Sequence, residues 1–287
     1  MSLVLEIEHC TAYAYSSPVR MSQNEARTTP LTDQRQISLH SELAVSPRPR
    51  SRLSYTDYFG THVEAFDIIE AHERLEVIGR SRVALNPAPS FAELREMPLD
   101  AAGDDDEVVE YTLPSAMVSW NGEIAAVAAD LREVEVRNTV YNAFWWLQTN
   151  LTYERGQTTV DTPVSEVLER RAGVCQDYAH LCCALLRSLG IATRYVSGYF
   201  APKPLEVGDE VLAESHAWVE IWLPGWGWWP MDPTHNVPAD MWRVKIGHGR
   251  DYRDVVPLKG VCVGDASQEL SVVVRIRRLP DWHGGRG

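Results

Sequence analysis

Apolar and polar residues alternate along the first part of the chain, from Leu3 to about Leu85. A period of two is typical of β-strands with one buried face, and turn-rich pieces separate the short runs. We therefore expect a β-sandwich-like module here. From Asn86 to about Leu113 the chain is rich in proline, alanine and acidic residues without a clear period. This composition predicts a linker, with a break in order near Asp104.

The pattern then changes to a helical period. Apolar residues recur at helical spacing from Asn121 to Thr149, which predicts a helix over this range. A short second helix is expected to follow and to continue to Arg171. Thr162 is its expected N-cap, and Pro163 fits its first helical position, where the missing N–H costs nothing.

A third helix is predicted in the stretch AGVCQDYAHLCCALLRSLG, residues 172–190. Apolar residues recur there at helical spacing, Arg187 lies in the last turn, and Gly190 supplies the stop. We expect this helix to begin very near Cys175. Cys182 and Cys183 fall in its middle among apolar neighbours, so we expect them only to pack.

After Gly190 the chain returns to strand patterns. In the run of residues 216–223 the aliphatic side chains share one face, so His216 is expected to point toward the opposite, polar and aromatic face. A turn at Pro224 and Gly225 indicates an antiparallel hairpin whose second strand ends at Asp232. An odd number of loop residues would place Asp232 on the face of His216, and an even number would place it on the other face.

These elements together predict an α+β protein in two parts. Residues 1–113 form the N-terminal β-rich module with its linker, and residues 114–287 form a second domain in which the helix at Cys175 packs on an antiparallel sheet. The strong β run over residues 270–276 could close the sheet of either part.

Three side chains of this second domain have the types that an activated thiol needs. The unpaired N–H groups and partial positive charge at a helix start favour the thiolate of Cys175 over its thiol. A histidine such as His216 can act as its base, and a carboxylate such as Asp232 can orient the imidazole. Each residue alone has a plainer structural explanation, but all three lie on elements that can converge.

Tryptophans are dense near these residues, and Trp218, Trp222 and Trp228 could wall a substrate cleft. A heavily aromatic core is an equally good explanation. Two further alternatives use the same side chains. One is a zinc site drawn from Cys175, His180, His216, Asp232 and His235, although no pair has the usual ligand spacing, so we expect no metal. The other is a protein without catalytic activity that binds a peptide or a glycan in the same cleft.

Composition narrows the class of partner. The 287 residues include 27 basic and 40 acidic side chains, a net charge of −13 that argues against nucleic acid or an anionic membrane surface as partner. No run of 18 apolar residues and no basic start of a secretory signal is evident. Five cysteines without a CxxC pair predict neither a disulfide framework nor a cysteine-based zinc site, so we expect a cytoplasmic protein.

Three segments resemble the bacterial transglutaminase-like proteins of the papain-like cysteine hydrolase and acyltransferase group. They are GVCQDYAHLCCALLRSLGIATRYVSGY, SHAWVEIWLPGWGWWPMDPTHN and GRDYRDVVPLKG. EHCTAYAYSSPVRMSQNEARTTP resembles the β-rich module of that family, although EARTTP departs from the strand found in relatives. The resemblance implies a papain-like or transglutaminase-like core and makes Cys175 the nucleophile, His216 the general base and acid, and Asp232 the residue that orients His216. The GRDY segment is expected to be structural.

The resemblance also implies a reaction. The Cys175 thiolate attacks an amide carbonyl, a thioester forms, and water or an amine releases the acyl group. The backbone N–H of Cys175 and one further donor would hold the oxyanion, with Gln176, Tyr153, Trp145 and Trp146 as candidates. The substrate is then an amide in a peptide, a protein or another molecule, without a cofactor. We favour hydrolysis over transamidation, and the oligomeric state is left open.

Overall fold

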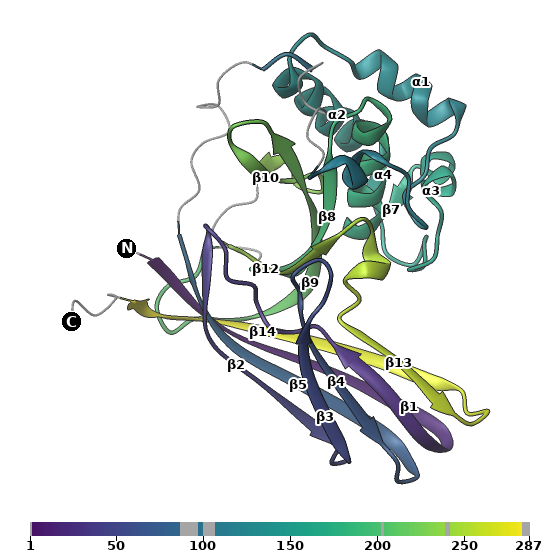
Figure 1. Ribbon diagram of the computed structural model, residues 1–287, viewed down its shortest axis with the longest axis vertical. Coiled ribbons are helices and arrows are strands. Elements are labelled where there is room, and N and C mark those ends of the chain that lie inside the picture. The colour runs from purple at the N-terminus through teal and green to yellow at the C-terminus, as the bar shows by residue number, and fades with distance from the viewer. Residues whose placement is uncertain (1, 87–96, 100–106, 202–203, 239–241, 283–287) are drawn as a thin grey trace.

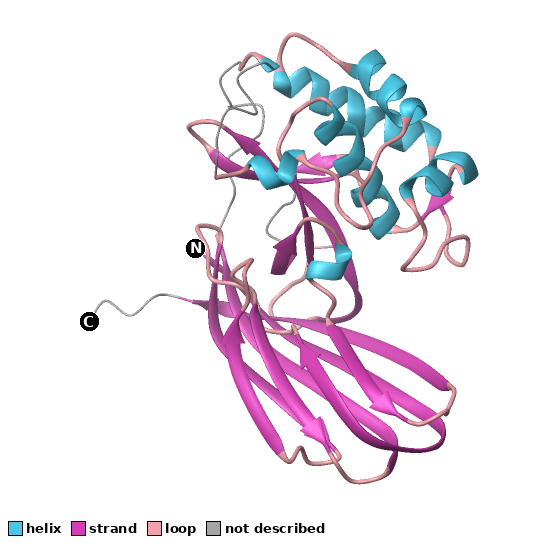
Figure 2. Ribbon diagram, turned by 45° about the vertical axis from the view of Figure 1, so that its right-hand side comes forward, coloured by secondary structure: helices cyan, strands magenta, loops and turns pink. Residues whose placement is uncertain are grey.

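The computed structural model describes residues 2–86, 97–99, 107–201, 204–238 and 242–282. It has a curled antiparallel sheet whose long strands form one end of the molecule, and a group of helices packed at the other end (Figures 1 and 2). The expected break near Asp104 lies outside the described residues, as do parts of the linker and of the loop after Ala201.

The described elements follow one another in this order. They are β1 (Ser2–Ala26), β2 (Gln36–Ser46), β3 (Ser51–Thr56), β4 (His62–Ile68), β5 (His72–Leu85), a 3₁₀-helix (Val109–Thr112), α1 (Gly122–Leu131), α2 (Val136–Asn150), β6 (Thr152–Tyr153), α3 (Val164–Arg170), β7 (Ala172–Gly173), α4 (Cys175–Ser188), β8 (Thr193–Phe200), β9 (Glu210–Leu223), β10 (Gly227–Asp232), β11 (Val237–Pro238), β12 (Arg243–Gly249), a second 3₁₀-helix (Tyr252–Asp254), β13 (Leu258–Val263) and β14 (Gln268–Trp282).

The expected β-module is built around the long strand β1. Its first half pairs with β5 and β14, and its second half pairs with β4 and β13, so one strand contributes to both sheet layers (Figure 1). A small core closes between the layers, formed by Ala26, Phe66, Ile68, Leu75, Val77 and Leu258. The prediction of β-structure over residues 3–85 is therefore confirmed, with two predicted runs merged into β1.

Strand β14 connects the two parts of the molecule. It pairs along most of β1 on one side and with β9 on the other, at Val274 opposite Ala213 and Ile276 opposite Val211. The β run predicted at residues 270–276 thus closes the sheet of both parts at once. A second core lies where they meet and includes Leu5, Ile7, Tyr199, Val244 and Ile276.

The helix predicted over residues 121–149 is interrupted, and this expectation was wrong in one respect. The chain forms α1 and α2 with an extended break between them, and Val134 there is 77% exposed. The break has a backbone cause. Leu99 N–H donates to Val134 O and Val136 N–H donates to Met97 O, so residues 97–99 pair with this segment as a strand would. Pairing with the supposed linker therefore replaces helical hydrogen bonds.

Two other local predictions need correction. Helix α3 starts at Val164, with Pro163 one position before it, and the Thr162 hydroxyl accepts a hydrogen bond from Thr159 N–H in place of capping the helix. The supposed linker contains the 3₁₀-helix Val109–Thr112, whose Tyr111 is buried against Trp228.

Helix α4 is the centre of the larger core, as its pattern predicted. It begins at Cys175 and ends at Ser188, and it contacts α1, α2, α3, β8 and β9. Its middle is fully buried, including Cys182 and Cys183, which pack as expected. None of the described helices combines the length and the hydropathy needed to cross a bilayer.

Candidate active site at the start of helix α4

Cys175 is the first residue of α4, and the turn that precedes it is fixed by Asp177. The buried carboxylate of Asp177 accepts a hydrogen bond from Val174 N–H at 2.7 Å and another from the Thr158 hydroxyl at 2.6 Å. A Cβ atom at Gly173 would lie 2.6 Å from that carboxylate, which explains glycine there. This cap satisfies one of the free N–H groups at the helix start and holds Cys175 at a defined position.

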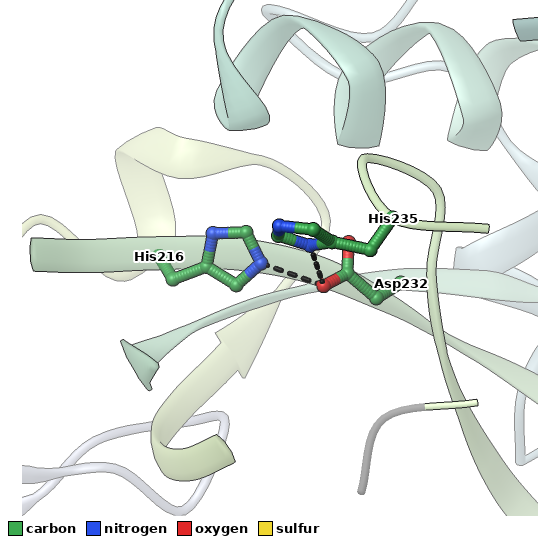
Figure 3. Close-up of side chains that lie close together, drawn as sticks. All are labelled: His216, Asp232 and His235. Atoms are coloured by element: carbon green, nitrogen blue, oxygen red, sulfur yellow. Dashed lines mark hydrogen bonds and ion pairs between the residues drawn. The ribbon is translucent and has the colours of Figure 1, made fainter. Parts of the chain in front are cut away.

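His216 faces this helix start from β9. The hairpin that carries it has a turn of three residues, 224–226, with Gly227 opposite Leu223 and Met231 opposite Val219. The odd loop therefore applies, and Asp232 lies on the face of His216. The His216 Nε2 atom is 2.8 Å from Asp232 Oδ2 (Figure 3).

The Asp232 carboxylate is fully buried and accepts hydrogen bonds at both oxygens. Besides His216, its Oδ2 atom contacts His235 Nδ1 at 2.8 Å and the Arg243 guanidinium, with Nε at 2.8 Å and Nη2 at 2.6 Å (Figure 3). Its Oδ1 atom accepts from Thr234 N–H at 2.9 Å. Burial alone would raise the pKa of Asp232, but the hydrogen bonds from both histidines and the charges of His216 and Arg243 hold that pKa well below its usual range.

The pKa of His216 shifts in the direction that a stable imidazolium requires. Burial alone would lower it. Side-chain hydrogen bonds with Asp232 and Cys175, together with the charges of these two groups, outweigh burial and raise the pKa to about 9. Since Nε2 is engaged by Asp232, the ring nitrogen left for Cys175 is Nδ1. His216 thus lies in the cleft beside Cys175 with its ring held by the carboxylate.

Two pockets, one on each side, share the residues around Cys175 and His216. The first, of about 440 Å³, is also lined by Phe200, Leu212, Thr234 and His235. The second, of about 430 Å³, extends toward Tyr195, Tyr252, Val272 and Val274. The exposed ion pair between Arg155 and Glu214 lines both pockets. Cys175 therefore lies in an open cleft with room for a substrate on either side.

Comparison with known proteins identifies the family. The model of the transglutaminase-like superfamily matches residues 125–233, and the model of the bacterial transglutaminase-like N-terminal region matches residues 5–84. The chain belongs to the transglutaminase-like superfamily. The resemblance seen in the sequence is thereby confirmed, and the matched core of this transglutaminase-like protein contains Cys175, His216 and Asp232.

Individual relatives of the transglutaminase-like chain differ in what they cover. An uncharacterized protein of Mycobacterium leprae is 39% identical over 278 residues, 96% of this chain and 99% of that protein. A protein-glutamine gamma-glutamyltransferase of Pseudomonas aeruginosa is 38% identical over 77 residues, only 26% of this chain and 12% of that protein. The crystal structure of a candidate cysteine protease from Cytophaga hutchinsonii has a TM-score of 0.78 at 24% identity, covering 99% of this chain and 94% of that one. This structural likeness confirms the predicted α+β fold.

The three tryptophans expected in the cleft of this transglutaminase-like protein lie elsewhere. Trp218 is 2% exposed, and its ring stacks on that of His216 at a centroid distance of 6.1 Å. It therefore covers one face of the histidine ring and does not line the cleft. Trp222 and Trp228 pack against each other near Tyr111. The cause is the β-alternation: the side chains of Trp222 and Trp228 share the face of His216 but lie farther along the hairpin, where the segment of Tyr111 covers them.

The other candidates for holding an oxyanion have distinct positions. Tyr153 lines both pockets and is 46% exposed, whereas the Gln176 amide donates to Val160 O at 2.9 Å. Trp145 is 65% exposed, and Trp146 packs under the Arg171 guanidinium. The last two do not line either pocket. Burial and the charge of Cys175 raise the pKa of Tyr153, so its hydroxyl keeps a proton to donate.

The residues considered for zinc do not fit a metal ion as they are arranged. Ligand atoms of His216, Asp232 and His235 lie within 4.8 Å of one another. However, the histidine nitrogens on this side are hydrogen-bonded to Asp232 Oδ2, and the Arg243 guanidinium places a positive charge on the same oxygen. His180 accepts a hydrogen bond from Tyr252 N–H through Nε2, so that lone pair is also used.

Sequence reasoning missed the part that Arg243 and His235 take in this site. His235 had been considered only as a metal ligand, and its position three residues after Asp232 was the available signal. Arg243 comes from β12, which reaches Asp232 only through the fold, and nothing local in the sequence marks it. The GRDY segment is structural as expected, because the buried Asp251 accepts hydrogen bonds from Met117 and Arg253 N–H groups.

Proposed function

We propose that this protein is a thiol-dependent amide hydrolase or acyltransferase in which Cys175 is the nucleophile. The observation that carries the proposal is the position of His216, which lines the same two pockets as Cys175 and is hydrogen-bonded to the buried Asp232. A pKa of about 9 keeps its ring protonated at neutral pH, which favours a thiolate beside it. Asp232 would fix the orientation of the ring.

The reaction would proceed in two halves. The Cys175 sulfur forms a bond to the amide carbonyl carbon, and the carbonyl oxygen takes the negative charge. His216 gives its proton to the departing nitrogen, the C–N bond breaks, and an acyl thioester remains on Cys175. A water molecule then attacks the thioester while His216 takes its proton. The C–S bond then breaks and the carboxylic acid leaves, while His216 keeps the proton taken from water, so that the starting pair of thiolate and imidazolium is restored.

The oxyanion needs two donors in this scheme. The backbone N–H of Cys175 at the start of α4 is one, because helix starts carry free N–H groups. Tyr153 is our choice for the other, since its protonated hydroxyl borders both pockets. Gln176 is less suited because its amide nitrogen already donates to Val160 O.

Water is our proposed acceptor, and an amine is the second candidate. The rim formed by Tyr153, Arg155 and Glu214 is exposed, so water has access to the sulfur. The local match to a protein-glutamine gamma-glutamyltransferase supports amine transfer as the alternative. In either case the proposed substrate is an amide of a peptide, protein or other molecule, and the scheme needs neither a metal nor a cofactor.

The cytoplasm is the compartment we propose. All five cysteines are free thiols in the structure, and Cys182 and Cys183 are buried inside α4. Such free thiols are common in reducing compartments. The acidic net charge of −13 supports a partner other than nucleic acid or an anionic membrane surface.

A substrate panel tests this proposal. Wild type and Cys175→Ala are compared on peptide amides and esters, with and without a fluorescent primary amine, by mass spectrometry of products. We expect turnover by wild type only and an acyl adduct of the Cys175 peptide on rapid quenching. Incorporation of the amine in preference to water would favour acyl transfer. Equal and slow labelling of Cys175 and the exposed Cys262 by iodoacetamide would refute the nucleophile and favour a binding protein.

A further inference from the structure

The second pocket beside Cys175, which extends toward β14, has several apolar side chains in its wall. They are Val160, Val174, Tyr195, Pro257, Val272 and Val274. Gln176, Ser197 and Ser215 add polar groups, and the exposed Arg155 and Glu214 form an ion pair with each other. The first pocket has no residue of β14 in its wall and is lined there by Phe200, Leu212 and His235. The two pockets therefore differ in the segments that a substrate would meet.

Part of this apolar wall comes from strands that belong with the β-module. Val272 and Val274 lie on β14, which pairs along β1, and Pro257 immediately precedes β13, which also pairs with β1. Residues two apart on a strand share a face, so both valines point toward the cleft. Val274 is 1% exposed and lies at the bottom, whereas Val272 is 46% exposed and lies at the mouth.

Exposed apolar side chains at this mouth have an energetic consequence. Val272 and Val160, which is 53% exposed, remain in contact with water unless something covers them. An apolar group that enters would remove their surface and its own from water, at about 25 cal/mol per Å² of apolar area. Cys175 itself lines this pocket. We therefore expect the apolar group that covers the two valines to belong to the same molecule as the amide that Cys175 attacks.

We propose that this pocket is a specificity site for a bulky apolar side chain next to the amide that Cys175 attacks, and that Val272 of β14 is one of its determinants. The proposal rests on the proposed function of Cys175. It also gives the β-module a role in substrate selection, because the wall supplied by β14 and by the segment before β13 exists only while those strands are paired with β1.

Alkylation of Cys175 by two neutral maleimides tests the pocket without a known substrate. N-methylmaleimide and N-cyclohexylmaleimide carry the same reactive double bond and differ only in apolar size. Rates are measured at the Cys175 peptide by mass spectrometry, and the exposed Cys262 of the same molecule gives the intrinsic ratio of the two reagents. We expect the cyclohexyl-to-methyl ratio at Cys175 to exceed that at Cys262 by about tenfold or more.

Two matched variants locate the effect. Val272→Asp should lower the cyclohexyl-to-methyl ratio at Cys175 about tenfold. A cyclohexyl ring that enters the pocket would displace water from the introduced carboxylate, and this desolvation is unfavourable. Val273→Asp is the control: Val273 is 38% exposed on the same strand, points to the opposite face and does not line the pocket, so the ratio should stay as in wild type. Circular dichroism verifies that both variants are folded.

The outcomes separate this proposal from the proposed function. A wild-type ratio at Cys175 equal to that at Cys262, or equal ratios in Val272→Asp and Val273→Asp, would overturn the specificity site even if Cys175 reacts fast. A Cys175 that reacts with N-methylmaleimide no faster than Cys262 would overturn the nucleophile, whereas the ratio of the two reagents would still report on the pocket.

Discussion

At the scale of single residues, the carboxylate of Asp232 decides the geometry of the site. Its Oδ2 atom accepts from two imidazoles and a guanidinium, and of these three groups His216 lines both pockets beside Cys175. A buried carboxylate with this many donors stays ionised and cannot rotate without losing several charge-assisted hydrogen bonds. Arg243 and His235 therefore fix Asp232, and Asp232 fixes His216.

The titration of His216 gives a prediction at this scale. In Cys175→Ala the pKa of His216 should fall below its wild-type value of about 9, because the hydrogen bond and charge of Cys175 are two of the causes that raise it. The measurement is the pH dependence of the His216 ring signals by NMR. The ring charge stabilises the wild-type fold fully below about pH 6.5, and this contribution is lost as the pH rises through about 9.

Cys262→Ala serves as the control for that titration, since it removes an exposed thiol that lines neither pocket and keeps Cys175 and the His216 bond to Asp232 in place. An unchanged His216 titration in Cys175→Ala would mean that sulfur and ring do not interact in solution.

The candidate site itself was largely predictable at this scale, since Cys175, His216 and Asp232 are marked by type and position. The contact of Arg243 with Asp232 was not predictable, because it depends on where β12 packs in the fold.

At the scale of elements, the start of α4 depends on one cap. Asp177 holds the Val174 N–H and the Thr158 hydroxyl, and burial raises the pKa of its carboxyl. The sequence predicted where α4 begins and ends, because helical spacing and Gly190 are local signals. It did not predict the break between α1 and α2, because residues 97–99 pair with that segment from outside the local window.

Replacement of Asp177 should show whether its hydrogen bonds or its negative charge stabilise the start of α4. Asp177→Ala should destabilise the fold by about 2 kcal/mol, since it removes a cap and leaves the Val174 N–H without an acceptor. Asp177→Asn should cost clearly less, because its amide oxygen in the place of Oδ2 can still accept from both the Val174 N–H and the Thr158 hydroxyl. Urea unfolding followed by circular dichroism measures both. Equal losses in the two variants would contradict the hydrogen-bonding explanation.

At the scale of the whole molecule, β1 and β14 join the chain ends into one sheet. Strand β14 lies between β1 of the N-terminal module and β9, which carries His216 (Figure 1). The division at residues 113 and 114 inferred from composition separates β13 and β14 from the strand with which both pair. If the chain were divided there, β1 in the first piece and β13 and β14 in the second would each lose a paired strand.

We therefore expect a single cooperative unfolding transition. Tryptophan fluorescence, which reports mainly on α2, β9 and β10, and the β-sheet signal in circular dichroism should give the same urea midpoint. A fragment of residues 114–287 should not fold alone, since β13 and β14 would lack β1. Two separated midpoints, or a folded fragment with native dispersion of its NMR signals, would show that the parts are independent.

The sequence by itself determined the elements whose signals are local: the strand alternation of residues 3–85, the helix beginning at Cys175, and the residue types able to activate a thiol. Only the tertiary structure decided what depends on contacts between distant segments. It set the three-residue hairpin turn that brings Asp232 to His216, the approach of Arg243 to the same carboxylate, the burial of Trp218 and the partial burial of Trp222 and Trp228. Hydrophobic periodicity specifies which face of an element is buried, but not which partner covers it.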